Sequence, residues 1–86
     1  MGSDVMTIKV LYFGRLRELC GSSEESVELR DGALIEDLFQ SCSAAKPELC
    51  KFRPSLVAAR NQEFAAWNTP LQSGDEVGFL PPVSGG

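Results

Sequence analysis

The last two residues of the chain carry the chemistry that the sequence offers most clearly. The sequence ends in Gly85 and Gly86, and a partner could adenylate or thiolate the carboxylate of Gly86. Glycine has no Cβ atom, so this tip can enter a channel too narrow for other residues and adopt the backbone angles needed there. A frayed end is the simpler interpretation, because chain termini are usually disordered unless tied down. The residues before the pair must therefore decide between these interpretations.

Two adjacent prolines, Pro81 and Pro82, separate this tip from a strand-like segment. Each proline fixes φ and lacks an N–H group, so the pair cannot continue a central strand and favours an extended path away from the domain. We therefore predict a tail, and its residues are Pro81, Pro82, Val83, Ser84, Gly85 and Gly86.

Residue types that perform catalysis or bind metals are otherwise scarce. The absence of histidine excludes the Ser-His-Asp and Cys-His arrangements and removes the commonest metal ligand. Cys20, Cys42 and Cys50 are odd in number and have no C-x-x-C spacing, which favours reduced thiols that fill the core. We therefore expect no metal and no bound cofactor.

Length and composition predict one small globular domain. A chain of 86 residues fits a single domain with a small core. No apolar run approaches the roughly 18 residues of a membrane span, and the N-terminus lacks a secretion signal, so we expect a cytoplasmic protein. The net charge is −4 and the basic residues are scattered, so neither nucleic acid nor a membrane is an expected partner.

Periodic patterns predict the first three elements. Residues 7–13 are rich in β-branched and aromatic residues that alternate with period two, as in a strand. Apolar residues at helical spacing indicate a short helix over residues 14–21, with Gly21 as its C-terminal cap. Residues 26–30 alternate again and predict a second, half-buried strand.

A longer amphipathic segment predicts the main helix. Asp31 is the expected N-cap, Glu36 and Asp37 place negative charge near the positive end of the helix dipole, and Pro47 ends the helix. Polar residues, including Ser43, are expected on the solvent side. The apolar stripe consists of Leu34, Ile35, Leu38, Phe39, Cys42 and Ala45.

The second half of the chain predicts three more strands. Residues 56–60 and 63–67 flank the short turn Asn61-Gln62 and form a predicted hairpin. Residues 76–80 are the predicted last strand, after a connection over residues 48–54. One amphipathic helix cannot cover both faces of a five-stranded sheet, so we predict an α+β fold with one open face. Exposed apolar residues on that face would mark a protein interface.

From residue 8 to residue 86 the sequence resembles one branch of the ubiquitin-like β-grasp family, the sulfur carriers that form the small subunit of molybdopterin synthase. The specific motifs are Gly74-Asp75-Glu76-Val77, which leads into the last strand, and the closing Pro-Pro-Val-Ser-Gly-Gly. The resemblance implies a mixed sheet of about five strands with the main helix on one face. The implied segments are a flexible extension (residues 1–6), the β-grasp domain (residues 7–80) and a flexible tail (residues 81–86).

The resemblance also implies that the chain is a carrier rather than an enzyme. An E1-like adenylating enzyme would activate the Gly86 carboxylate with ATP, and sulfur from a donor would convert the acyl adenylate into a thiocarboxylate. The tail would then enter the large subunit of molybdopterin synthase, which supplies the catalytic pocket, and give its sulfur to the molybdopterin precursor. The family further implies a heterotetramer with one small subunit at each end of a dimer of large ones.

Functional residues carried over from the family belong to the tail and to one sheet face. Gly86 would be thiocarboxylated, and Gly85 would give a side-chain-free approach to it. Core packing is the alternative interpretation for each apolar strand residue. The implied docking residues are Phe13, Phe64, Leu80, Pro81, Pro82, Val83 and Ser84.

Other functions stay open at this point. A ubiquitin-like modifier would join Gly86 to a lysine of a target, although an arginine-rich segment before the glycines suits that branch better. A sulfur carrier for thiamine or transfer-RNA thiolation would look alike, although those tails generally lack the double proline. The simplest alternative is a β-grasp interaction module with an incidental tail.

Overall fold

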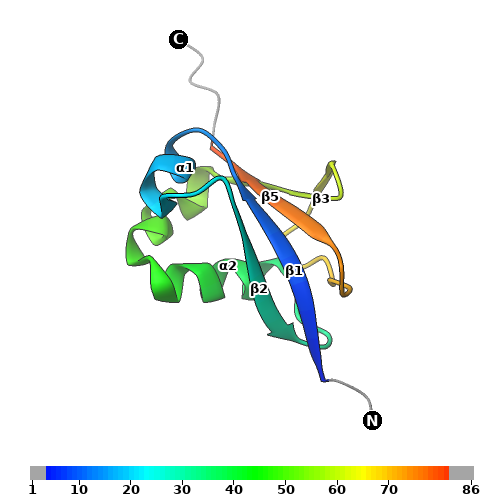
Figure 1. Ribbon diagram of the computed structural model, residues 1–86. Helices are drawn as coiled ribbons and strands as arrows, with labels where there is room; N and C mark the ends of the chain where they lie inside the picture. Colours follow the sequence, from blue (N-terminus) through cyan, green and yellow to red (C-terminus); the bar gives the residue numbers. More distant parts are fainter. Residues whose placement is uncertain (1–3, 82–86) are drawn as a thin grey trace.

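The fold is a five-stranded sheet with its helical segments against one face (Figure 1). The computed structural model describes residues 4–81. Across the sheet the strands lie in the order β2-β1-β5-β3-β4. The elements are β1 (Val5–Tyr12), α1 (Arg15–Cys20), β2 (Glu24–Arg30), α2 (Ile35–Ala45), the 3₁₀ helix η1 (Pro47–Ser55), β3 (Val57–Arg60), β4 (Glu63–Ala65) and β5 (Glu76–Leu80).

The two central strands determine where the tail leaves the domain. β1 and β5 pair in parallel, with Lys9 opposite Glu76 and Tyr12 opposite Phe79, whereas the other neighbouring strands pair antiparallel. Because β1 and β5 run in the same direction, both strands finish at the same end of the sheet, next to α1 (Figure 1). We call this the tail end of the sheet, since Pro81 follows β5 there.

The core lies between the sheet and α2. Alternate residues of β1, including Val10 and Tyr12, are buried against the helical layer, as their period-two pattern predicted. Phe39 of α2 packs edge-on against Phe79 at 5.3 Å between ring centroids and against Trp67 at 5.5 Å. Such edge-to-face contacts are favourable for aromatic pairs. The helix therefore covers one face of the sheet as predicted.

The first strand begins earlier than predicted. We expected a flexible extension over residues 1–6, but β1 starts at Val5. Met6 is only 3% exposed, because the alternation that buries Ile8 also directs residue 6 into the core. The carbonyl of Asp4 accepts a hydrogen bond from the N–H of Asp31 just beyond β2, which ties down the start of the strand.

The predicted N-cap of the main helix is wrong. Asp31 lies in a turn before α2, which begins at Ile35. The first helical N–H groups, those of Ile35 and Glu36, donate instead to the carbonyls of Thr69 and Trp67. Orphan N–H groups at a helix start need partners of some kind. Here a loop distant in sequence supplies them, so no side-chain cap from Asp31 is needed.

The last turn of α2 also departs from the predicted stripe. Ala45 is exposed, whereas Ser43 is buried, and its Oγ atom has no hydrogen-bond partner within the part of the chain that the structure describes. The reason is η1, which packs beside α2 and covers its polar side near the end. Leu49 is buried and anchors η1 in the core.

The hairpin of the second half is confirmed. β3 and β4 pair antiparallel around Asn61 and Gln62, which have φ angles of 51° and 72°. Two-residue hairpin turns of the primed types require such positive angles. β4 ends at Ala65, before the predicted Trp67. Within residues 4–81, no helix combines the length and apolar character that a membrane crossing requires.

Candidate functional site

The sheet face opposite the helices carries exposed apolar side chains. Phe64 is 79% exposed and Phe13 is 37% exposed. Both lie near the tail end of the sheet, where they line a groove together with Leu80. We call this hollow the sheet groove, and its apolar lining consists of Leu11, Phe13, Ala59, Phe64, Gly78 and Leu80.

The structure therefore brings together the three strand residues that the resemblance singled out. Phe13, Phe64 and Leu80 come from three different parts of the chain and all border the sheet groove. The alternative interpretation as core residues is wrong for Phe13 and Phe64, which are exposed, while Leu80 is half-buried. Large apolar side chains gathered on an open face are typical of a protein interface.

The floor of the sheet groove is made of small residues that the sequence analysis did not identify. Gly78 lies between Leu11 of β1 and Ala59 of β3, and Ala59 lies opposite Phe64 of β4. A Cβ atom on Gly78 would lie 2.9 Å from Cε2 of Phe13, so the Phe13 ring rests directly on the backbone of β5. A glycine inside a strand often marks such a close approach, and this signal was available in the sequence.

The tail begins at one end of this groove. Leu80 is the last residue of β5, pairs with Val57, and is followed by the half-buried Pro81. A Cβ atom placed on Gly14, whose φ is 56°, would lie 3.2 Å from Cγ of Pro81, so Pro81 lies against the turn before α1. The remaining predicted tail residues lie outside the described part of the chain, and these are Pro82, Val83, Ser84, Gly85 and Gly86.

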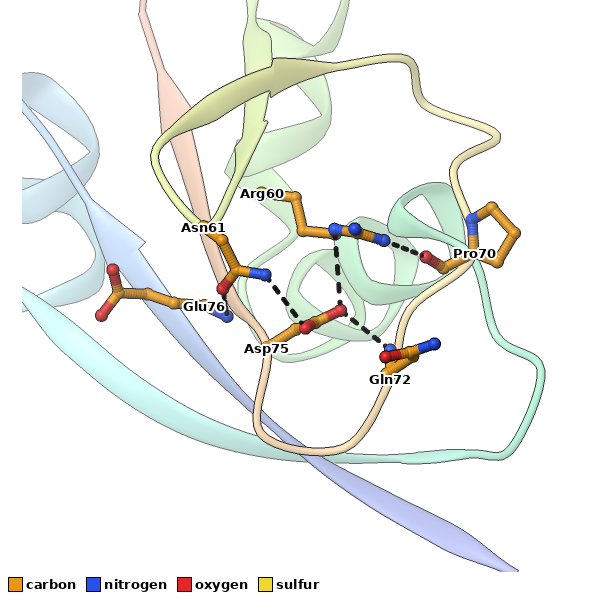
Figure 2. Close-up of polar contacts among 6 residues, drawn as sticks. All are labelled: Arg60, Asn61, Pro70, Gln72, Asp75 and Glu76. Atoms are coloured by element: carbon orange, nitrogen blue, oxygen red, sulfur yellow. Dashed lines mark hydrogen bonds and ion pairs between the residues drawn. The ribbon is translucent and has the colours of Figure 1, made fainter.

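A buried carboxylate joins the β3–β4 hairpin to the loop before β5 (Figure 2). Asp75 is 8% exposed. Its Oδ1 accepts a hydrogen bond from Nδ2 of Asn61 at 3.1 Å, and its Oδ2 accepts one from the N–H of Gln72 at 2.9 Å. Nε of Arg60 lies 3.8 Å from the same Oδ2. Asp75 is therefore both hydrogen-bonded and paired with a cation, as a buried carboxylate must be.

Further contacts of the same network fix the hairpin against β5 (Figure 2). The side-chain oxygen of Asn61 accepts from the N–H of Glu76 at 3.0 Å, and the N–H of Asn61 donates to the carbonyl of Glu76 at 2.7 Å. Arg60 also donates to the carbonyl of Pro70 at 3.0 Å. The network thus holds the end of β3 and the hairpin turn against β5, and β4, which carries Phe64, pairs with β3.

Burial disfavours the thiolate form of two of the three cysteines. Burial raises the pKa of the buried Cys42 thiol and also that of the half-buried Cys20 thiol. The hydroxyl of Tyr12 lies 3.5 Å from Sγ of Cys42 and donates to Oε1 of Glu25 at 2.7 Å. A protonated thiol is a poor nucleophile and a poor metal ligand. Cys50, expected as core filler, is exposed instead and borders an open hollow together with Gln40 of α2 and Arg53 of η1.

Comparisons with known proteins identify relatives over nearly the whole chain. The profile of the ThiS family matches residues 10–86. A curated relative from Chlamydomonas reinhardtii, the molybdopterin synthase sulfur carrier subunit, is 46% identical over 83 residues, which cover 94% of this chain and 100% of the relative.

Several solved structures share this fold. SAMP1 from Haloferax volcanii has a TM-score of 0.81 and 28% identity, with 93% of this chain and 99% of that chain covered. A protein–protein complex of subunits 1 and 2 of molybdopterin-converting factor from Helicobacter pylori has a TM-score of 0.63 and 28% identity, with 94% and 100% covered. The predicted ubiquitin-like β-grasp fold is confirmed.

Proposed function

The chain belongs to the ThiS family, and on this premise we propose that it is the sulfur carrier subunit of molybdopterin synthase. One observation carries the proposal. The last strand ends at the border of an exposed apolar groove, so a partner bound to the sheet groove sits where the tail begins. This arrangement supports a carrier whose C-terminus enters the active site of a bound partner.

The first chemical step activates the C-terminus. A carboxylate is a poor electrophile, so an E1-like enzyme transfers AMP from ATP to the Gly86 carboxylate and releases pyrophosphate. A sulfur donor then displaces AMP, which is a good leaving group, and leaves a thiocarboxylate on Gly86. Gly85 has no side chain to obstruct this approach. The activating enzyme uses the ATP, and the carrier itself holds no cofactor.

The second step takes place in a partner. The tail enters the large subunit, which supplies the catalytic pocket, and the thiocarboxylate gives its sulfur to the molybdopterin precursor during molybdenum cofactor biosynthesis. Water restores the oxygen of the carboxylate. The relative from Helicobacter pylori, a complex of subunits 1 and 2, supports a large-subunit partner. We infer a cytoplasmic heterotetramer with two copies of each subunit, in which this chain is not itself catalytic.

The docking residues of this proposal fall into two groups. Phe13, Phe64 and Leu80 border the sheet groove and provide apolar contact area. Aromatic residues are enriched in protein interfaces because they bury a large area at a low cost in conformational entropy. The second group follows directly along the chain and consists of Pro81, Pro82, Val83 and Ser84.

A protein modifier is the second candidate, and the similarity to SAMP1 favours it, because small archaeal modifier protein 1 shares this fold. Activation would be the same, but Gly86 would form an isopeptide bond to a target lysine. The segment Pro81-Pro82-Val83-Ser84 contains no arginine, which favours the carrier over the modifier. Carriers for thiamine or transfer-RNA thiolation share the chemistry but differ in the acceptor, and their tails generally lack the double proline.

Deletion of Gly86 tests the proposed role of the tail. In a mixture of activating enzyme, ATP, sulfur donor, large subunit and precursor, we expect the truncated chain to transfer no sulfur. Its thermal midpoint should stay nearly unchanged, because the core residues lie between Met6 and Phe79. Deletion of Gly2 and Ser3 at the other terminus is the matched control and should leave transfer intact. Activity of the truncated chain would refute the tail mechanism.

A further inference from the structure

We propose that Cys50 is a modification site, where a small peptide thiol that carries carboxylates forms a mixed disulfide and occupies the hollow between α2 and η1. We call this space the helix hollow, and its lining residues all come from α2 and η1. The sheet groove is lined instead by the open face of the sheet and the hairpin. The inference goes beyond the proposed function, because neither the tail nor the sheet groove takes part in it.

Cys50 is the accessible thiol of the chain. Cys42 is buried and Cys20 is half-buried, and burial raises the pKa of both thiols. Disulfide exchange needs a thiolate that a second sulfur atom can reach, so an exposed cysteine is favoured over a buried one. The lining residues of the helix hollow include no second cysteine. The thiol that joins Cys50 there must therefore come from another molecule.

The helix hollow also contains a polar group without a partner. Ser43 is only 8% exposed, and its Oγ atom makes no hydrogen bond within the described part of the chain. Glu36, Gln40 and Ser43 are spaced by four and three residues, so they lie on one stripe of α2, and all three line the hollow. Buried hydroxyl groups without a partner are rare in folded proteins. A peptide group held in the hollow provides the missing partner.

The size and border of the helix hollow suit a small peptide. Its volume is about 460 Å³, and small-molecule sites typically measure about 300–1,000 Å³. The exposed Gln40 amide at the border offers both donors and an acceptor. Arg53 is held at the same border by its ion pair with Glu36 and by the Trp67 ring, whose centroid lies 3.5 Å from its Cζ. The polar border is therefore already formed before a ligand enters.

The charge around Cys50 favours a thiol that carries carboxylates. Residues 46–53 contain three basic side chains and one acidic side chain, although the whole chain has a net charge of −4. Glu36 offsets the charge of Arg53, so the attraction comes mainly from Lys46 and Lys51. Such a local excess of positive charge raises the concentration of an anionic disulfide near the site.

The modification is a thiol–disulfide exchange. The Cys50 thiolate attacks one sulfur atom of a small symmetrical disulfide, so that a new S–S bond forms to Cys50 and the original S–S bond breaks. The released half leaves as a thiolate with the bonding electron pair and takes up the proton that Cys50 lost. The small disulfide is the oxidant, and an excess of the reduced thiol reverses the step.

Intact mass of the full chain after incubation with oxidised glutathione tests the site. Wild type should gain one glutathione minus two hydrogen atoms, and Cys50→Ser should gain nothing. The rate should fall as salt is added, because salt screens the attraction by Lys46 and Lys51. An adduct that persists in Cys50→Ser overturns the site. A rate that does not change with salt overturns the choice of an acidic thiol.

Ser43→Ala tests whether the helix hollow holds the adduct. In a glutathione redox buffer, this change should lower the exchange equilibrium constant about threefold to tenfold, the effect of one net hydrogen bond. The unmodified Ser43→Ala chain should unfold at the same urea concentration as wild type or a higher one, because the lost hydroxyl had no partner. Ser41→Ala is the matched control, since Ser41 is exposed on α2 outside the hollow, and should leave the constant unchanged.

The remaining outcomes decide between occupants of the helix hollow. An equal exchange constant in wild type and Ser43→Ala would mean that Cys50 is merely an exposed thiol, and the proposed site would be wrong. A disulfide-linked dimer of two chains in place of the mixed disulfide would make the occupant a second copy and would equally overturn the proposal. Neither result bears on the proposed function, because Gly86 takes no part in the exchange.

Discussion

Tyr12 shows how a single residue links the core to a pH-dependent property. Its ring is buried between the sheet and α2, and its hydroxyl contacts Glu25 and Cys42. Burial, together with these two hydrogen bonds, raises the pKa of the Tyr12 hydroxyl well above its ordinary value of 10.0. The folded chain therefore keeps this proton under alkaline conditions in which the unfolded chain loses it.

We expect the free energy of unfolding to decrease as the pH rises through 10.0. Below that pH both states hold the Tyr12 proton and the contribution is complete; above it the unfolded state binds fewer protons, so stability is lost until the folded pKa is reached. Tyr12→Phe keeps the ring and removes this ionisation. Urea unfolding at several pH values should give a shallower decrease for Tyr12→Phe, and equal slopes would contradict this account.

Residue by residue, the sequence predicted the exposed aromatic positions better than the space between them. Phe13 and Phe64 were identified through the family resemblance, and both prove to be exposed. Ala59 and Gly78 were missed, because a small residue in a strand says nothing about a hollow until its neighbours across the sheet are known. Which residues become neighbours across the sheet depends on the order and register of the strands, and the sequence analysis did not predict the register.

Among the elements, the β3–β4 hairpin depends most on contacts that the sequence does not reveal. Its two-residue turn was predicted from Asn61 and Gln62 and is confirmed. Its attachment to β5 was not predicted, because the hydrogen bond from Asn61 to Asp75 joins residues 14 positions apart. The motif around Asp75 was recognised as a family landmark, and the structure gives its physical reason.

Asp75→Ala should lower the free energy of unfolding by about 1–3 kcal/mol, because it removes two part-buried hydrogen bonds that the carboxylate accepts from Asn61 and Gln72. Urea unfolding measures this change. Asp31→Ala is the matched control, since Asp31 is exposed and lies outside α2, and its effect should stay within about 0.5 kcal/mol. A loss of about 1 kcal/mol or more in the control would instead restore Asp31 as the N-cap.

The buried face of the main helix could be predicted from the sequence, but its first residue could not. Its buried stripe followed from the period of the apolar residues, and Ile35, Leu38 and Phe39 lie in the core as predicted. The first residue of α2 was not predicted correctly, because the carbonyls of Thr69 and Trp67 accept hydrogen bonds from its first N–H groups. Local capping rules cannot anticipate a partner more than thirty positions away.

At the scale of the whole molecule, parallel pairing of β1 with β5 places the groove and the start of the tail at one end of the sheet. The fold class and the open face could be predicted from the element order and from one amphipathic helix. The predicted tail residues beyond Pro81 lie outside the described part of the chain, so their chemistry stays a proposal.

The intact mass of the chain tests this central proposal most directly. After incubation with its activating enzyme, ATP and a sulfur donor, the mass should rise by the difference between a sulfur and an oxygen atom. A chain extended by one residue beyond Gly86 is the matched control and should keep its original mass. We expect the mass to rise in wild type alone. An unchanged wild-type mass in the presence of an active enzyme would contradict the proposed thiocarboxylate on Gly86.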